Sequence, residues 1–396
     1  MQTATAWSTD KDSSQAINSA LSSLSQKLSQ APDLILLYAS ELYDALILLQ
    51  AIQQKYPSVK IAGCTSCLGV MTEAGFHQDD GYGLGLMGIN MVGSSVGVGS
   101  ALIEDDPENA ATSAVSEAIS NAQRPGELPD FVFLHAAPGC EEQILQGLKS
   151  YLGDHIPIQG GSSADNTVAG NWQQFANDEV IETGVVITVV YSDQPFFTAF
   201  HSGYEPTRHQ GLVTAADGRT LMSIDYKPAA EVYNQWSGGE FTHYLPQGGN
   251  VLSATSLFPL GRVVGYTGAV PYYRLSHPDG IGADGSMRLF SEIEKGDVVS
   301  LMKGTKSSLL TRAGRVVQTA LDQSKGDDEI AAALVVYCAG CMLTVKDDMQ
   351  EVVNSINDSL DGKPFIGIFT FGEQGYFSGG ENCHGNLMIS ASVWAK

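Results

Sequence analysis

The chain has 396 residues, of which 43% are hydrophobic and 16% charged, so it is typical of a globular protein with a sizeable core and not of a disordered one. Its 44 acidic residues outnumber 21 Lys and Arg, and the net charge of −23 excludes nucleic acid and anionic membrane surfaces as expected partners. The first residues lack a signal peptide's apolar segment, and no run approaches the roughly 20 apolar residues of a membrane helix, so we expect a cytoplasmic protein.

Helical and extended patterns alternate from the N-terminus. Asp12 begins a capping box, after which apolar residues recur at helical spacing as far as Leu28. A continuous apolar run then predicts a buried strand that ends at Tyr38. A second amphipathic helix closes at Pro57, before a strand that reaches Gly63. The predicted order is α-β-α-β.

The same order recurs twice further along the chain. Gly63 follows Tyr38 by 25 residues, and Gly160 follows His135 by the same interval. The third copy ends in a similar turn at Gly367, and each copy continues into a loop and a β-rich segment. We therefore predict an α/β fold of repeated α-β-α-β-β units, in which layered mixed sheets pack with helices.

Three segments are expected to superpose as copies of one topology, namely 33–91, 130–191 and 332–394. A Gly-, Tyr- and Pro-rich stretch over residues 220–300 breaks the pattern and is interpreted as a smaller element between the second and third units. The predicted division is a ligand-sensing domain over 1–220, built of two units, and a second domain over 221–396.

Six loops follow strands at equivalent positions of the units, so they should meet at one edge of the sheets, where open α/β sheets bind ligands. They are YASEL, GCTSCLG, HAAPGCEE, GGSSADN, YCAGCML and FGEQGYF.

Four stretches resemble the FIST family of sensory proteins: IAGCTS, PIQGGSSADN, YKPAAEVYNQW and PFIGIFTFGEQGYFSGGENCHGNL. The resemblance runs from about residue 30 to about residue 390. It implies a cytoplasmic, non-catalytic sensor of small ligands such as amino acids. The chain also resembles the stand-alone, nitric-oxide-sensing NosP branch, which implies haem as cofactor and a separate histidine kinase or cyclic-di-GMP signalling partner.

Two Cys-x-x-Cys turns lie in the loop set and are formed by Cys64 with Cys67 and by Cys338 with Cys341. Four thiolates suit zinc or an iron–sulfur cluster if the fold brings them together, and such a site would be sensitive to oxidation. The hypothesis requires Cys64 and Cys341 to lie within metal-bridging reach. The alternative is that the cysteines pack as small buried hydrophobes.

Haem needs an axial ligand, commonly His, and an apolar slot. Neither cysteine pair is followed by His, which excludes covalent attachment of the c type. His135 and His384 stand at loop positions and His243 lies in the insert, so these three are the candidate ligands, with structural roles as the alternative.

Gly-rich turns are also suited to a carboxylate, and Asp165 or Glu373 to an ammonium group, although the same residues are natural turn formers. The candidate ligand-binding residues are Gly160, Gly161, Ser162, Ser163, Asp165, Asn166, Gly372 and Glu373. Neither serine lies in a nucleophile-elbow frame, so the sequence gives no support for an enzyme.

Overall fold

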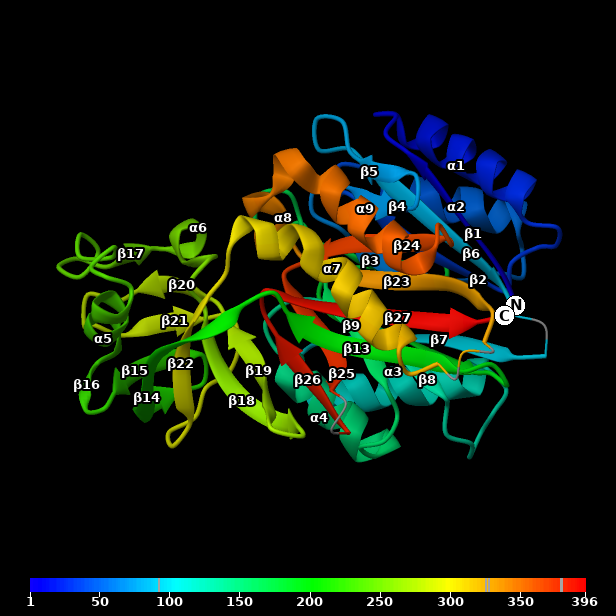
Figure 1. Cartoon of the computed structure of the whole chain (residues 1–396). Coiled ribbons are helices and arrows are strands. Elements are labelled where there is room, and N and C mark those ends of the chain that lie inside the picture. Colours follow the sequence, from blue (N-terminus) through cyan, green and yellow to red (C-terminus); the bar gives the residue numbers. More distant parts are fainter. Residues whose placement is uncertain (92, 325, 327, 378–379) are drawn as a thin grey trace.

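The computed structural model describes residues 1–91, 93–324, 326, 328–377 and 380–396. Three six-stranded mixed sheets form the body of the molecule, and a fourth, nine-stranded sheet forms a lobe at one side (Figure 1). Helices flank the three body sheets. The mixed α/β class predicted from the sequence is confirmed.

The first unit begins with a strand that the sequence pattern did not reveal. Its elements are β1 (Gln2–Ser8), α1 (Ser13–Lys27), β2 (Leu34–Ala39), α2 (Ala45–Lys55), β3 (Lys60–Thr65), β4 (Val70–Thr72), β5 (Gly75–His77) and β6 (Leu84–Asn90). Asp12 caps α1 by accepting the N–H of Gln15, as the capping-box pattern predicts.

The second unit repeats this order. Its elements are β7 (Ser95–Leu102), α3 (Pro107–Asn121), β8 (Phe131–Ala136), α4 (Glu141–Leu152), β9 (Ile158–Ser162), β10 (Gln174–Ala176), β11 (Glu179–Ile181) and β12 (Gly184–Tyr191).

The third unit is interrupted after its first strand by the insert. Its elements are β13 (Phe196–Ser202), α7 (Lys306–Leu321), β23 (Ile330–Cys338), α8 (Ala339–Thr344), η1 (Lys346–Asp348), α9 (Met349–Leu360), β24 (Phe365–Thr370), β25 (Gly372–Phe377), β26 (Glu381–Gly385) and β27 (Met388–Ala395).

All three units have one strand order, so the expected threefold repetition is confirmed. The orders are β1-β6-β2-β3, β7-β12-β8-β9 and β13-β27-β23-β24, with a parallel pair at the end of each. Each unit is nevertheless larger than the predicted α-β-α-β-β, because it adds a leading strand and a hairpin.

The hairpins are exchanged between units in a cycle. Hairpin β4–β5 of the first unit extends the third unit's sheet, β10–β11 of the second extends the first, and β25–β26 of the third extends the second. The segment FGEQGYF, expected to be a loop, is therefore mostly strand β25. Its Glu373 and Gln374 are buried because β25 pairs with β9 and β26.

Three equivalent backbone hydrogen bonds close this cycle. Ala164 N–H donates to Thr65 O over 3.0 Å, Phe371 N–H to Ser162 O over 3.0 Å, and Cys67 N–H to Phe369 O over 3.1 Å. The three acceptor residues are equivalent, because each lies two positions after the glycine of its unit's repeated turn, which is Gly63, Gly160 or Gly367. The loops after the parallel strands thus meet at one place, as predicted.

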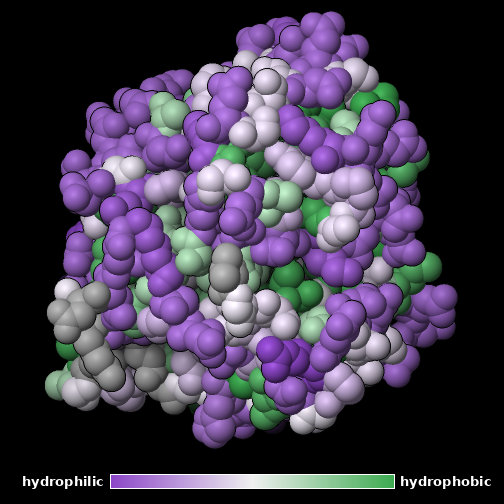
Figure 2. All heavy atoms as spheres, turned by 90° about the vertical axis from the view of Figure 1, so that its right-hand side faces the viewer, coloured by the Kyte–Doolittle hydropathy of each residue, from purple (hydrophilic) through white to green (hydrophobic). Residues whose placement is uncertain are grey.

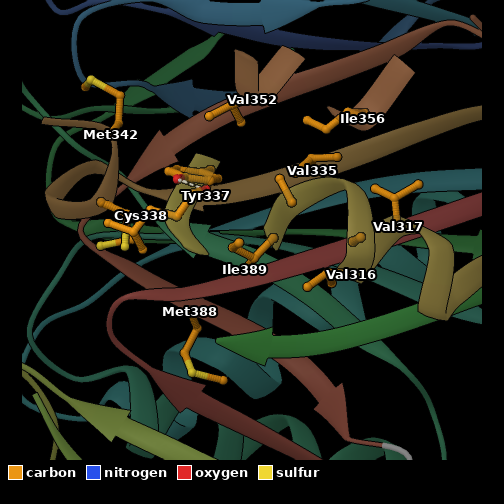
Figure 3. Close-up of a cluster of buried hydrophobic side chains, with 14 of the residues drawn as sticks. Val316, Val317, Val335, Tyr337, Cys338, Met342, Val352, Ile356, Met388 and Ile389 are labelled. Atoms are coloured by element: carbon orange, nitrogen blue, oxygen red, sulfur yellow. Dashed lines mark hydrogen bonds between the residues drawn. The ribbon is translucent and has the colours of Figure 1, made fainter. Parts of the chain in front are cut away.

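Among the described residues, the core of the body has one central and three outer parts, and the insert has a core of its own. Side chains of all three body sheets, including Tyr38, Phe133 and Trp394, fill the centre. Each outer part lies between one sheet and its two helices. Figure 3 shows the outer part of the third unit, where Val317 of α7 and Ile356 of α9 approach β23 and β27.

The insert forms the nine-stranded sheet. Its elements are β14 (Glu205–Asp217), β15 (Thr220–Ile224), β16 (Lys227–Pro228), α5 (Ala229–Trp236), β17 (Gly249–Asn250), α6 (Leu252–Thr255), β18 (Leu260–Thr267), β19 (Val270–Ser276), β20 (Pro278–Ile281), β21 (Met287–Leu289) and β22 (Val298–Lys303).

The two-domain division near residue 220 stays a prediction, and the sheets support a different partition. The insert's sheet already begins with β14, whereas β13 belongs to the third unit. The body face turned away from the insert is largely hydrophilic, with scattered apolar side chains (Figure 2). Within the described residues, no helix combines the length and apolarity needed to cross a membrane.

Candidate functional site

A cavity of about 470 Å³ lies where the insert meets the second and third units. Its volume is within the usual range for small-molecule sites, roughly 300–1,000 Å³. Much of the wall is apolar and comes from all three parts of the chain: Pro138, Val168, Trp172, Leu252, Phe290, Leu343 and Phe371. Polar groups are few and include Glu141, Arg219, His277, Cys338 and Asn386. We call this space the insert cavity.

Arg219 joins the insert to the second unit at the wall of this cavity. Its side chain reaches from the β14–β15 turn to the first turn of α4, where Nη2 donates to Glu141 over 2.5 Å and to Glu142 over 2.7 Å. Glu141 is buried and also accepts the hydroxyl of Ser162 over 2.6 Å. The junction is therefore a hydrogen-bonded ionic cluster.

The cluster holds both glutamates in the charged state. Burial would raise the pKa of Glu142, but His384, Arg219 and the N–H of Glu292 outweigh burial and lower that pKa to about 2. The pKa of Glu141 is also lowered, because His384 and Arg219 overcome the effect of its burial.

His277 is the imidazole on the cavity wall. Its Nε2–H donates to Leu252 O over 3.1 Å, and its backbone N–H donates to Asn386 Oδ1 over 3.3 Å. Burial lowers its pKa to about 4, so the ring is neutral at pH 7. Nδ1 has no hydrogen-bond partner among the described residues and carries the lone pair. Sequence reasoning missed His277, because it lies in the irregular insert outside any repeated motif.

The three expected histidines lie elsewhere. His135 is buried in the central core, where Nε2 and the hydroxyl of Tyr38 are 2.9 Å apart. His384 is buried beside Gln374 Nε2 at 3.1 Å, and it faces a smaller pocket of about 150 Å³. His243 is exposed, and its ring lies 3.9 Å from that of Tyr244 in a tilted arrangement. None of the three is among the described residues that line the insert cavity.

The expected Gly, Ser and Asp set builds the joints between units. Gly160 and Gly161 lie in β9 and pair with β8 of their own unit and with β25 of the third unit, and Ser163 Oγ donates to Ala136 O over 3.1 Å. The carboxylate of Asp165 accepts four backbone N–H groups of its own loop, from Thr167 and Ala169–Asn171. That carboxylate is thus already satisfied and does not suit an ammonium ligand.

The remaining members of that set are engaged in the same way. The N–H of Asn166 donates to Glu41 over 2.9 Å, and Gly372 pairs with Ser162 across β25 and β9. Glu373 is fully buried, where it accepts Thr370 Oγ1–H over 2.9 Å and the N–H of Met388 over 3.0 Å. None of the eight is among the described residues that line the insert cavity.

The four cysteines do not assemble around one point. Cys64 belongs to the central core, whereas the other three belong to the third unit's outer core. Burial raises the pKa of Cys64 and of Cys67 to about 12, so both are neutral thiols. This arrangement does not fit a four-thiolate zinc or iron–sulfur centre and favours the alternative of packed thiols.

One group of metal-ligating side chains does come together in the described part of the chain. Ligand atoms of Glu141, Glu142 and His384 all lie within 4.8 Å of one another. The guanidinium of Arg219 is already bound to both carboxylates, so it supplies the positive charge that the cluster requires.

The fold and cavity define a small-molecule-binding α/β protein in which three exchanged units carry an inserted lobe. The chain belongs to the FIST family: the model of the FIST N domain matches residues 33–227 and that of the FIST C domain residues 229–376. FIST domains are sensory domains of signal transduction. They bind small ligands and are not catalytic.

Similarities to individual proteins are local or weak. An uncharacterized protein of Methanocaldococcus jannaschii is 35% identical over 103 residues, which are 26% of this chain and 20% of that protein, so the match spans a fifth of the relative's length. Cyanuric acid hydrolase from A. caulinodans aligns over 100% of this chain and 99% of its own with 7% identity and a TM-score of 0.39. Phosphoribosylformylglycinamidine synthase II of Thermotoga maritima aligns over 76% of this chain and 72% of its own with 12% identity and a TM-score of 0.22. These scores carry no argument about function.

Proposed function

We propose that this chain is a cytoplasmic sensor that takes haem into the insert cavity, responds to nitric oxide and regulates a separate histidine kinase or cyclic-di-GMP signalling partner. The observation that carries the proposal is the insert cavity itself, an apolar space of about 470 Å³ with a neutral imidazole on its wall. The family's sensory role and its small ligands support the same conclusion.

The residues of the cavity fit haem in two respects. Leu252, Phe290 and Phe371 supply apolar surface for a macrocycle. The hydrogen bond from Nε2–H of His277 to Leu252 O fixes the tautomer, as the second hydrogen bond of a metal-ligating histidine usually does. His277 would hold the iron, and the N–H groups of Arg219 that are not bound to Glu141 and Glu142 would pair with a carboxylate of the ligand. When bound, haem iron supplies a coordination position for nitric oxide.

Haem titration of the purified full-length chain tests this proposal. We expect a Soret band that shifts when nitric oxide is added, and we expect His277→Ala to weaken or broaden it. His243→Ala is the matched control, because His243 is exposed and lies outside the cavity. A chain that takes up no haem, or a His277→Ala variant with an unchanged spectrum, contradicts the proposal.

A second candidate ligand is a zwitterion such as an amino acid. It is favoured by Arg219 on the cavity wall, because the bonds to Glu141 and Glu142 use only Nη2 and leave Nη1 and Nε for the carboxylate of such a ligand. Thermal-shift measurements with amino acids on haem-free protein separate the candidates. If an amino acid stabilises the protein and Trp172→Ala abolishes that stabilisation, the amino acid binds in the cavity.

A further inference from the structure

The two Cys-x-x-Cys turns have the same spacing and different surroundings. Cys64 at the end of β3 belongs to the central core and approaches Ser163, whereas Cys67 belongs to the third unit's outer core. These two thiols therefore lie in different cores. Cys338 and Cys341 both belong to the outer core, and they are near enough that, in addition to burial, the Cys341 thiol helps to raise the pKa of Cys338.

We propose that Cys338 and Cys341 are a reversible dithiol–disulfide switch in the wall of the insert cavity, and that a peroxide is its oxidant. Cys338 is the N-cap of α8 and lines the cavity, so a small oxidant in the cavity reaches its sulfur (Figure 3 shows the position of Cys338). Cys341 is buried on the first turn of the helix. The switch does not depend on which ligand the cavity binds.

The geometry needs only a small local change. Cβ atoms three residues apart on a helix are about 5–6 Å from each other, whereas a disulfide needs about 3.5–4.5 Å, so the turn must tighten by roughly 1–2 Å. Helix α8 has six residues, and Cys338 precedes it with an extended backbone. A short helix with one end in a strand accommodates such a change more easily than the interior of a long helix.

Glu373 relays a proton in the first step. Cys338 pairs with Thr370 across β23 and β24, and the hydroxyl of Thr370 donates to Glu373 over 2.9 Å. Burial raises the pKa of Cys338 and that of Glu373 well above their usual values, so both groups carry their protons before the reaction. The Glu373 carboxyl therefore accepts the thiol proton only as it gives up its own, and the sulfur that loses its proton is the nucleophile that a peroxide oxidises.

The redox steps balance with hydrogen peroxide as the electron acceptor. The Cys338 sulfur attacks one peroxide oxygen as its proton passes to Glu373, and the O–O bond breaks. Glu373 gives its own proton to the departing oxygen, so the products are a sulfenic acid at Cys338 and water. The Cys341 thiol then attacks the Cys338 sulfur, the S–S bond forms, and a second water leaves. Two thiols have lost two electrons and two protons, and a small-molecule dithiol restores them.

Formation of the Cys338–Cys341 disulfide also affects the point at which the chain enters the insert. The hydroxyl of Tyr204 lies 3.5 Å from Cys341 Sγ and donates to Ser256 O over 2.6 Å. Tyr204 lies directly before β14, and Ser256 lines the cavity. Movement of the Cys341 sulfur toward Cys338 therefore alters a contact that helps to place the insert against the body.

The test is peroxide treatment of the native, full-length Cys140→Ser variant, since Cys140 is the most exposed of the six thiols. We expect a mass loss of two hydrogen atoms and, after alkylation and digestion, one cross-linked species joining Cys338 to Cys341. Cys64 and Cys67 provide the matched control and should both be alkylated once the protein is denatured. A Cys64–Cys67 cross-link of similar yield, or four intact thiols, would overturn the proposal.

Two further variants identify the chemistry. Cys341→Ala should stop at a dimedone-reactive sulfenic acid on Cys338, whereas Cys338→Ala should give neither product. Glu373→Gln should slow thiol loss by at least about 100-fold, the lower end of the range that general acid–base catalysis contributes. Unchanged oxidation in Glu373→Gln would remove that residue from the mechanism, and disulfide formation involving other cysteines in Cys341→Ala would contradict the assignment of the pair.

Discussion

Replacing Arg219 with Ala would leave two glutamates without their counter-charge at the junction of insert and body. The side chains of Glu141 and Glu142 are 2% and 16% exposed, and that of Arg219 is 21% exposed. Removing one partner of a buried ion pair costs about 3–5 kcal/mol, since the other charge is left uncompensated. Partial exposure of Arg219 and the remaining bond from Ser162 place the expected loss at the lower end, about 3 kcal/mol.

Urea unfolding at neutral pH, followed by tryptophan fluorescence, measures this loss. Adding Glu141→Gln and Glu142→Gln to Arg219→Ala should recover most of it, because no unpaired charge then remains buried. Arg288→Ala is the control: Arg288 also pairs with an acid, Asp279, but its side chain is 65% exposed, so we expect about 0–1 kcal/mol. A loss below about 1 kcal/mol in Arg219→Ala, or no recovery in the triple variant, would refute the reasoning.

Three further outcomes are expected from substitutions at Gly160, Glu142 and Tyr38. Gly160→Ala should lower the free energy of unfolding by about 3 kcal/mol or more, because its Cβ would lie 1.8 Å from Leu134 O. In Gly265→Ala, the Cβ meets nothing within 4 Å, and urea midpoints should stay close to the parent. The pKa of Glu142 is lowered from 4.5 to about 2, so its stabilisation is complete above pH 4.5 and is lost as the pH falls toward 2. Urea midpoints measured across that interval should fall less steeply in Glu142→Gln, and parallel curves would contradict the assignment. Tyr38→Phe should cost about 1–3 kcal/mol in thermal unfolding by leaving His135 Nε2 without a partner, and an unchanged midpoint would show that the buried bond is unimportant.

The repeated part of the fold was predictable because its signals are local. The helical spacing after Asp12 and the apolar run to Tyr38 reflect burial of single faces and single strands, which neighbouring residues determine. The exchanged hairpins were not predictable in this way. The sequence of β25 is rich in Gly and polar residues, and it becomes a strand because β9 of another unit offers unpaired backbone groups at its edge.

The candidate site was predictable only in its general location. Loops after the parallel strands do meet, but the backbone bonds of Ala164, Phe371 and Cys67 use them to join the units. The ligand space needs the insert as its other wall. Arg219 and His277 lie in that insert, where no periodicity marks them, so their roles depend on contacts with residues more than 70 positions away.

The insert also explains why one junction between units differs from another. The connections from β1 to α1 and from β7 to α3 take only a few residues, whereas the equivalent connection from β13 to α7 contains the whole insert. At the junction of the first and second units, an open hollow is lined by Glu41, Leu68 and Asn166 and edged by the exposed Asp79 and Asp80. Polar and charged side chains suit this surface because it is exposed to water. Where the insert covers the body, the apolar side chains of Phe290 and Leu252 face those of Phe371 and Leu343 across the insert cavity. The insert thus gives a chain of three similar units an apolar cavity at the junction that it covers, whereas the uncovered junction of the first and second units stays open.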